Sequence, residues 1–329
     1  MRILITGGCG FIGSHFSDHI LRNTNWEIII LDRLSYASNG FDRLRDSKLF
    51  DDKRVKVLTA DLILPIPHGL RQEIGQIDYL VHMGAETHVD RSLTDPRSFV
   101  YSNVVGTFEM LEFARSIACF KKFIYMSTDE VFGPSLDGYE FKEWDRYKSS
   151  TPYSASKAGG EELVVSYNNA FNLPTVIVHT MNVYGERQHP EKFIAKAIKK
   201  LLTGDVVDLY YDPKTGEHST RNWIHARNVA DAILFLIQYG EIGEKYNIVG
   251  EKKSNLHLMQ LMCRTLDIKG LLLRNVDAKL ARAGHDLHYA LDGSRMKELG
   301  WKAPVDFENS FIHTVQWFAK PENRKWLDS

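Results

Sequence analysis

Short, continuously apolar runs recur along the first half of the chain, and stretches with helical spacing separate them. The runs lack the apolar/polar alternation of half-exposed strands, so they favour parallel strands covered on both faces. Between them, FIGSHFSDHILRN (11–23), FVYSNVVGTFEMLEFARSIA (99–118) and SASKAGGEELVVSYNNAF (154–171) are predicted helices. The strand candidates are RILIT (2–6), WEIIILD (26–32), VKVLTAD (55–61), YLVHMGA (79–85), KFIYMST (122–128) and PTVIVHT (174–180). This alternation predicts an α/β fold with a doubly wound parallel sheet of the Rossmann type.

After about residue 180 the alternation of strands and helices becomes less regular. Polar, aromatic segments punctuated by Pro and Gly, such as YYDPKTGEHSTRNW, take over, although NVADAILFLIQYG (228–240) and YNIVG return to helix and strand. We therefore predict a second, smaller mixed α/β domain for the substrate, with a ligand cleft between the two domains. The predicted boundaries are 1–180 and 224–249 for the Rossmann domain, and 181–223 and 250–329 for the substrate domain.

Composition narrows the function classes. The net charge of the 329 residues is −1, so no basic field favours nucleic acid or an anionic membrane. The three cysteines are far apart and form no CxxC or Cys/His cluster, so we expect neither a metal nor a disulfide framework. No apolar run approaches the roughly 20 residues of a membrane helix, and the start has no cleavage site after an apolar core. We expect a soluble, cytoplasmic protein.

A glycine-rich turn follows the first predicted strand directly. Gly7, Gly10 and Gly13 have GxxGxxG spacing, with Phe11 and Ile12 between the last two. Gly7 would make the tight turn, Gly10 would let the backbone approach a pyrophosphate, and Gly13 would allow close helix packing. Because the helix N-terminus offers free N–H groups and a positive dipole end, this segment predicts a dinucleotide site.

Acidic residues close the second and third predicted strands. Asp32 can accept hydrogen bonds from a ribose diol and repels a 2′-phosphate, which favours NAD over NADP. A cap or turn residue is the alternative for Asp32, and the neighbouring Arg33 could hold a 2′-phosphate. Asp61 and Leu62 are predicted adenine contacts, with a turn residue as the alternative.

A proton-transfer pair lies in one predicted helix. Tyr153 and Lys157 are four residues apart and share a helix face. Tyrosine has an ordinary pKa of about 10. An ammonium nearby, together with a positive cofactor ring, stabilises the phenolate, so Tyr153 could take a proton from a substrate hydroxyl. YxxxK alone is common on surface helices, and only its combination with the glycine turn and with Ser127-Thr128 at a strand end makes it specific.

Ordered motifs along almost the whole chain resemble the extended short-chain dehydrogenase/reductase superfamily. Within it, the nucleotide-sugar 4,6-dehydratases of the dTDP-glucose 4,6-dehydratase type are the most similar group. The motifs are TGGCGFIGSH, LDRLSYASN, HMGAETHVDRS, NVVGTFEMLE, STDEVFG, PYSASKA, NVYG, HPEKFI, RNW, YNIVG, GHD and ALD…KELGW. AETHVDRS and the Ser-Thr-Asp-Glu run indicate the subfamily. The resemblance implies NAD, a nucleoside diphosphate glucose and a homodimer packed through the helices around 104–118 and 154–170.

The resemblance also implies a reaction. NAD oxidises carbon 4 of the hexose, water is lost across carbons 5 and 6, and hydride returns to carbon 6. Thr128 would bond the 4-hydroxyl and Tyr153 would be the base, while Asp129 would protonate the departing 6-hydroxyl and Glu130 would remove the carbon 5 proton. Consecutive strand residues point to opposite faces, so Asp129 and Glu130 reach one site only if the chain bends after Thr128. Two acids capping a helix are the structural alternative.

Further site residues follow from the same resemblance. Thr87, His88 and Asp90 would line the sugar pocket, and a purely structural role is the alternative for His88. The nucleotide diphosphate would be held by Asn182, Glu191, Lys192, Arg221 and Asn247, with His288 in place of a basic residue.

The chain departs from the resemblance mainly around the nucleotide. Phe132 stands where tyrosine is usual, Val183 replaces a second asparagine, and DLYYDPKTGEHSTRNW replaces the stretch that would wrap the base. Thymine and uracil therefore both remain open. The alternatives to a dehydratase are a 4-epimerase or a uronate decarboxylase of the same superfamily, and, in another class, a non-catalytic protein that binds NAD or a nucleotide sugar. The adjacent Asp129-Glu130 argues against an epimerase, which needs no pair for eliminating water.

Overall fold

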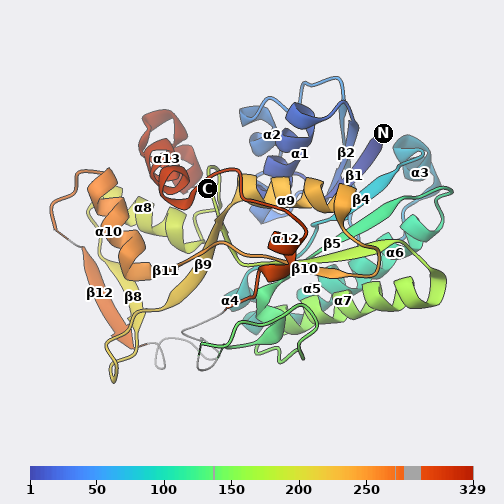
Figure 1. Ribbon diagram of the computed structural model, residues 1–329. Helices are drawn as coiled ribbons and strands as arrows, with labels where there is room; N and C mark the ends of the chain where they lie inside the picture. The colour runs from blue at the N-terminus through green and yellow to red at the C-terminus, as the bar shows by residue number, and fades with distance from the viewer. Residues whose placement is uncertain (136–137, 271, 278–289, 329) are drawn as a thin grey trace.

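A seven-stranded parallel sheet forms the centre of the protein, whose computed structural model describes residues 1–135, 138–270, 272–277 and 290–328. The strand order is β10-β6-β5-β4-β1-β2-β3 (Figure 1). The strands are β1 (Arg2–Thr6), β2 (Glu27–Asp32), β3 (Val55–Thr59), β4 (Tyr79–His82), β5 (Lys122–Thr128), β6 (Thr175–Thr180) and β10 (Lys245–Ile248). The predicted doubly wound sheet is confirmed. Its strand order reverses between β1 and β4, and ligands bind at the carboxyl ends beside such a switch point.

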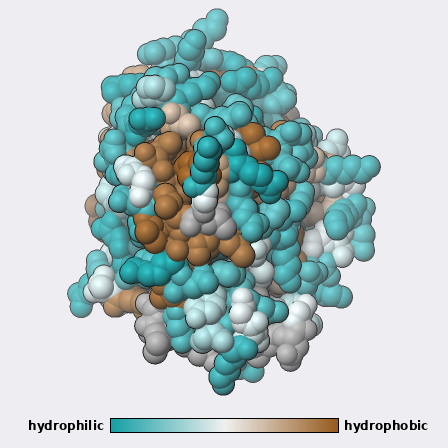
Figure 2. All heavy atoms as spheres, turned by 90° about the vertical axis from the view of Figure 1, so that its left-hand side faces the viewer, coloured by the Kyte–Doolittle hydropathy of each residue, from teal (hydrophilic) through white to brown (hydrophobic). Residues whose placement is uncertain are grey.

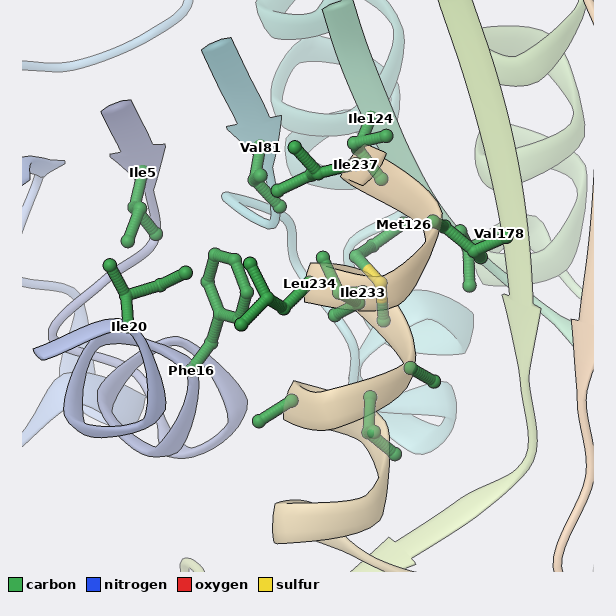
Figure 3. Close-up of a cluster of buried hydrophobic side chains, with 14 of the residues drawn as sticks. Ile5, Phe16, Ile20, Val81, Ile124, Met126, Val178, Ile233, Leu234 and Ile237 are labelled. Carbon is green, nitrogen blue, oxygen red and sulfur yellow. The ribbon is translucent and has the colours of Figure 1, made fainter. Parts of the chain in front are cut away.

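Helices cover both faces of this sheet. Successive residues of β1 alternate between the faces, so Ile3 and Ile5 pack into one core and Leu4 into the other. This arrangement explains why the strand reads as a continuous apolar run. Figure 3 shows the first core, where Ile5, Val81, Ile124 and Val178 meet side chains of α1 and α9. The helices are α1 (Phe11–Asn23), α2 (Asp42–Asp46), α3 (His68–Ile74), α4 (Val89–Thr94), α5 (Pro96–Val100), α6 (Gly106–Arg115), α7 (Pro152–Phe171), α9 (Ala226–Tyr239) and α12 (Ser294–Glu298), with the short turn η1 (Tyr36–Ser38).

The predicted continuous helix over 99–118 is wrong in one respect, because a π-helical turn, η2 (Tyr101–Val105), separates α5 from α6. The Asn103 side chain in this turn bonds across to neighbouring elements. Its Oδ1 accepts the Glu86 backbone N–H at 2.8 Å, and its Nδ2 donates to the Ser156 hydroxyl at 2.9 Å. The π-helical turn therefore ties the loop after β4 to α7.

The segments after β6 add two small sheets and a second core (left side of Figure 1). Tyr184, Ile198, Met259 and Phe311 are buried in this core. Hydrophobic residues gather at the surface of this side in Figure 2. The strands here are β7 (Asn182–Tyr184), β8 (Val207–Tyr211), β9 (Thr220–His225), β11 (Glu251–Ser254) and β12 (Leu273–Asp277). The helices are α8 (Phe193–Thr203), α10 (Asn255–Thr265), α13 (Phe307–Ala319), η4 (Pro321–Asn323) and α14 (Lys325–Asp328).

Across the described ranges, no helix combines the length and the apolar character that a membrane span requires.

Candidate active site

One cleft of about 360 Å³ opens at the carboxyl ends of the central strands. Its walls combine the glycine turn after β1, the ends of β2 and β5, the start of α7 and the segment before α8. The sequence-predicted residues that line it are Gly7, Gly10, Phe11, Ile12, Gly13, Asp32, Asp61, Leu62, Thr87, Thr128, Asp129, Glu130, Tyr153, Lys157, Asn182, Glu191 and Lys192. The structure thus brings the predicted cofactor and catalytic residues, together with Thr87, Asn182, Glu191 and Lys192 of the predicted substrate residues, to one cavity.

The glycine turn has no room for side chains. Gly7 has a φ of +69°, and a Cβ there would lie 2.8 Å from the Gly84 backbone nitrogen. A Cβ on Gly13 would collide with the Gly7 carbonyl oxygen. The turn leads directly into α1, whose N-cap is Gly10. A bare backbone at the start of a 13-residue helix fits a pyrophosphate, because the ligand can approach the free N–H groups.

Asp32 is buried at the neighbouring strand end. Its two oxygens accept backbone N–H groups, from Cys9 at 3.0 Å and from Leu34 at 2.8 Å. Burial raises the pKa of the Asp32 carboxyl, and these two bonds counter the rise. The neighbouring Arg33, which could have held a 2′-phosphate, forms ion pairs with Glu86 and, at 3.9 Å, with Asp61. This end of the cleft fits the diol of an unphosphorylated adenosine ribose.

Arg43 is a cleft residue that the sequence did not reveal. It is 1% exposed and lines the cleft near Asp32. Its Nη1 donates to the carbonyl oxygens of Ala37 and Ser38, whereas its Nη2 has no hydrogen-bond partner among the described residues. Arginine side chains are mostly exposed in proteins, so the sequence alone did not indicate that Arg43 is buried.

The chain bends directly after β5, as the two predicted acids require. Thr128 ends the strand and caps a short 3₁₀ turn, η3 (Asp129–Phe132), by accepting the Glu130 N–H at 3.4 Å. Its hydroxyl also donates to Asp129 Oδ1 at 3.0 Å. Because the turn replaces the alternation of a strand, both Asp129 and Glu130 line the cleft.

Asp129 is only 7% exposed. Burial raises the pKa of its carboxyl from 3.8 to about 6, although the Thr128 hydroxyl and the positive charge of Arg221 lower it. Arg221 lies on β9 and is not part of the cleft wall, so it acts on Asp129 through its charge. A carboxyl group with this pKa can deliver a proton near neutral pH.

Tyr153 and Lys157 lie one turn apart at the start of α7. Thr151 and Ser154 form a capping box there, which fixes the beginning of the helix. Burial lowers the pKa of Lys157 to about 7. Burial also raises the pKa of Tyr153, and the negative charge of Glu130 adds to the rise, while a hydrogen bond with Thr128 opposes it. A positive charge in the cleft lowers the pKa of Tyr153 toward that of a usable base, and an oxidised nicotinamide ring carries one.

Charged side chains gather around Glu191 at the cleft mouth. The Tyr36 hydroxyl lies 3.3 Å from one Glu191 oxygen, and His88 Nε2 lies 3.6 Å from the same oxygen. Lys192 Nζ donates to the Thr87 carbonyl oxygen at 3.3 Å. His88 is therefore held at the rim by Glu191. Asp90 is exposed in the first turn of α4 and does not line the cleft.

Asn247 lies apart from the cleft. Its Nδ2 donates to the backbone oxygens of Phe141 and Asp292 at 3.0 Å each, and its Oδ1 lies 3.0 Å from His179 Nδ1. These contacts use the amide within the protein, so they do not support the predicted role in binding the diphosphate. His288 lies outside the described residues.

Two further cleft residues carry buried polar atoms. Thr180 Oγ1 and Trp223 Nε1 have no hydrogen-bond partner among the described residues, and both side chains line the cavity. Each can therefore form a hydrogen bond with a ligand. The sequence showed RNW as a motif but could not show which of its atoms would face the cavity.

The chain is similar to known proteins over nearly its full length. A family model described as GDP-mannose 4,6 dehydratase matches residues 4–314. The dTDP-glucose 4,6-dehydratase of Escherichia coli is 36% identical over 352 residues, covering 100% of this chain and 95% of that protein. The low-salt glycan biosynthesis protein Agl12 of Haloferax volcanii is 36% identical over 325 residues, covering 97% and 98%. The crystal structure of DesIV, a dTDP-glucose 4,6-dehydratase from Streptomyces venezuelae with NAD bound, matches with a TM-score of 0.87 at 34% identity, covering 99% and 98%.

Proposed function

The chain belongs to the GDP-mannose 4,6 dehydratase family, and from this membership we propose that it is a nucleotide-sugar 4,6-dehydratase of the dTDP-glucose 4,6-dehydratase type. It converts a nucleoside diphosphate glucose to the 4-keto-6-deoxy sugar, with NAD as its cofactor. The observation that carries this proposal is the Asp129-Glu130 turn, which brings two carboxyl groups to the cavity that Tyr153 and Lys157 also line.

The glycine turn and Asp32 would hold NAD, with Asp61 and Leu62 at the adenine. The bare backbone of Gly7 and Gly13 and the partly unpaired Arg43 support this assignment. When bound, NAD accepts hydride from carbon 4 and returns it to carbon 6.

The chain's own residues handle the protons. Thr128 bonds the 4-hydroxyl of the sugar, and Tyr153, with Lys157 beside it, takes the proton of that hydroxyl as carbon 4 is oxidised. Glu130 removes the proton from carbon 5, which the neighbouring ketone has made acidic. Asp129 gives its proton to the 6-hydroxyl, which leaves as water, and a proton returns to carbon 5 from Glu130 when carbon 6 is reduced. The raised pKa of Asp129, about 6, supports its role as the acid.

The remaining substrate contacts are proposed on the same basis. Thr87, His88 and Asp90 would serve the sugar, and Asn182, Glu191, Lys192 and Arg221 would serve the diphosphate. Thr180 and Trp223 add two polar atoms at the same cavity that have no partner in the described part of the chain. The names of the relatives favour a thymine nucleotide, because they include dTDP-glucose 4,6-dehydratases at 36% identity.

Substrate competition tests the proposal. Purified protein is incubated with equal concentrations of dTDP-glucose and UDP-glucose, and mass spectrometry follows the loss of one water from each. We expect faster conversion of dTDP-glucose. Preferred conversion of UDP-glucose would contradict the base assignment alone, and an unchanged mass with inverted carbon 4 would identify an epimerase. Binding without conversion of either would favour the non-catalytic alternative.

We also propose residues 1–180 and 224–249 as the NAD-binding domain, residues 181–223 and 250–329 as the nucleotide-sugar domain, and a cytoplasmic homodimer. A row of exposed apolar residues along α5, η2 and α6 supports the dimer, because Val100, Tyr101 and Phe108 are 49%, 47% and 41% exposed. Light scattering tests the dimer: Phe108→Glu is expected to give monomers, and an unchanged mass would contradict this interface.

A further inference from the structure

A fully buried carboxylate lies behind the catalytic strand end. Glu161 is 0% exposed, and four polar groups from separate segments converge on it. The Ser127 hydroxyl donates to Oε2 at 2.7 Å, and Lys245 Nζ lies 2.8 Å from Oε1. The Tyr147 hydroxyl donates to Oε1, and His179 Nε2 lies 3.1 Å from the same oxygen. None of these contacts was visible in the sequence.

The cluster joins the elements that carry the predicted chemistry. Tyr153, Lys157 and Glu161 follow one another at four-residue spacing, so they share the face of α7 that packs on the sheet. Ser127 precedes Thr128 at the end of β5 and pairs with His179 of β6 in register. The carboxylate therefore links the helix that bears the base to the strand whose end bears the acid.

The charge of this carboxylate is maintained in the interior. Burial alone would raise the pKa of the Glu161 carboxyl, but the charges and hydrogen bonds of His179 and Lys245 lower it to about 2. A buried ion network of this kind contributes little net stability compared with apolar packing of similar volume. Its contacts are directional, however, and fix the relative position of the segments that make them.

We propose that Glu161 is a positioning residue for the dehydration, acting through Ser127. By holding the Ser127 hydroxyl, Glu161 sets the end of β5, and with it Thr128 and Asp129, at the correct distance from Tyr153 on α7. This inference rests on the proposed function, because it concerns the same reaction. It adds a residue that does not line the cleft.

The test compares variants that break or weaken the link with one that breaks a different buried lysine contact. Ser127→Ala removes only the hydroxyl, Glu161→Gln removes the charge, and the pair Glu161→Gln/Lys245→Met removes both charges. Lys122→Met is the matched control: Lys122 is buried at the other end of β5, and its Nζ donates to three backbone oxygens, including those of Leu236 and Gly240.

We expect Ser127→Ala and Glu161→Gln each to lower kcat about tenfold with KM within about twofold, since a displacement of 1 Å can cost about 100-fold. Because both act through one contact, the combined Ser127→Ala/Glu161→Gln variant should be no slower than the slower single variant. Amide hydrogen exchange of residues 127–132 should be faster in both single variants. Lys122→Met should lower the melting temperature but leave kcat and this exchange unchanged.

A wild-type kcat in Ser127→Ala, or losses that multiply in the combined variant, would overturn the inference. If Glu161→Gln does not fold, Ser127→Ala and the double variant Glu161→Gln/Lys245→Met test the inference by the same kcat and hydrogen-exchange criteria. If the wild-type protein converts neither dTDP-glucose nor UDP-glucose, the proposed function fails separately. The hydrogen exchange of residues 127–132 then decides whether Glu161 fixes the strand end, and unchanged exchange in Ser127→Ala contradicts it.

Discussion

Replacing Asp129 by asparagine should stabilise the protein while it removes the proposed acid. The carboxyl is 7% exposed, and its pKa is raised from 3.8 to about 6, chiefly by burial. Folding therefore favours the protonated form. Well below pH 3.8 the folded and unfolded states both carry the proton, so the group imposes no penalty. The penalty grows as the pH rises from 3.8 to about 6, because only the unfolded state ionises freely, and it stays constant above that range.

The size of this penalty follows from the shift. About two pKa units correspond to about 3 kcal/mol, and for a chain of this length that energy corresponds to a change of about 4 °C in melting temperature. Asparagine keeps the size of the side chain and an oxygen for the Thr128 hydroxyl, which donates to Asp129 at 3.0 Å. Asp129→Asn should consequently melt about 4 °C above the wild-type protein at pH 8.

Thermal unfolding with saturating NAD, at one scan rate and at pH 4 and pH 8, measures this difference. At pH 4, where the penalty has only begun to develop, the melting temperatures of Asp129→Asn and the wild-type protein should agree to within about 1 °C. At pH 8 the variant should melt about 4 °C higher. Asp51→Asn, which changes an exposed aspartate, serves as the control and should shift neither value. Equal melting temperatures at pH 8, or a stabilisation that is larger at pH 4, would refute the claim that burial raises the pKa of Asp129 and so lowers the stability of the folded state.

Three other changes probe separate parts of the protein. Glu130→Gln should allow oxidation at carbon 4 but block loss of water, so reduced cofactor should accumulate in its absorbance spectrum, and a normal yield of dehydrated product would contradict the role of Glu130. In Gly13→Ala the added carbon collides with the Gly7 carbonyl oxygen, so the variant should purify with at least about tenfold less bound NAD. A wild-type NAD content would exclude this turn as the pyrophosphate site. Lys122→Met removes the buried ammonium that donates to three backbone oxygens and should cost about 2–3 kcal/mol of unfolding free energy. An unchanged midpoint in a denaturant titration would disprove this.

The strands of the sheet could be predicted because strands buried on both faces appear in the sequence as continuous apolar runs. The run KFIYMST was predicted over 122–128, and β5 spans Lys122–Thr128. The glycine turn was equally readable, since its backbone tolerates no side chains at Gly7 or Gly13. The helix over 99–118 was not fully predictable. In its π-helical turn, Asn103 bonds Glu86 and Ser156, which are distant in sequence and leave no local pattern.

The site was predictable where its residues are neighbours in the chain, and it was not where they meet only in the fold. Strand geometry alone made it uncertain that Asp129 and Glu130 could face one cavity, and the bend that allows this arises from the cap at Thr128. Asn247 was assigned to the diphosphate, but its amide is used by Phe141, Asp292 and His179. The contact of Glu161 with Ser127 joins residues 34 positions apart, a separation that leaves no local pattern.

The central claim is that the protein eliminates water from a nucleotide hexose after oxidation at carbon 4. The most direct measurement is mass spectrometry of the product formed from dTDP-glucose in deuterated water, with the position of the label assigned by NMR. The account predicts a product that has lost one water and carries one solvent deuterium at carbon 5, because Glu130 exchanges the proton that it removes. Loss of water without deuterium at carbon 5 would contradict the role of Glu130, and an epimerised product of unchanged hydration would contradict the dehydratase assignment.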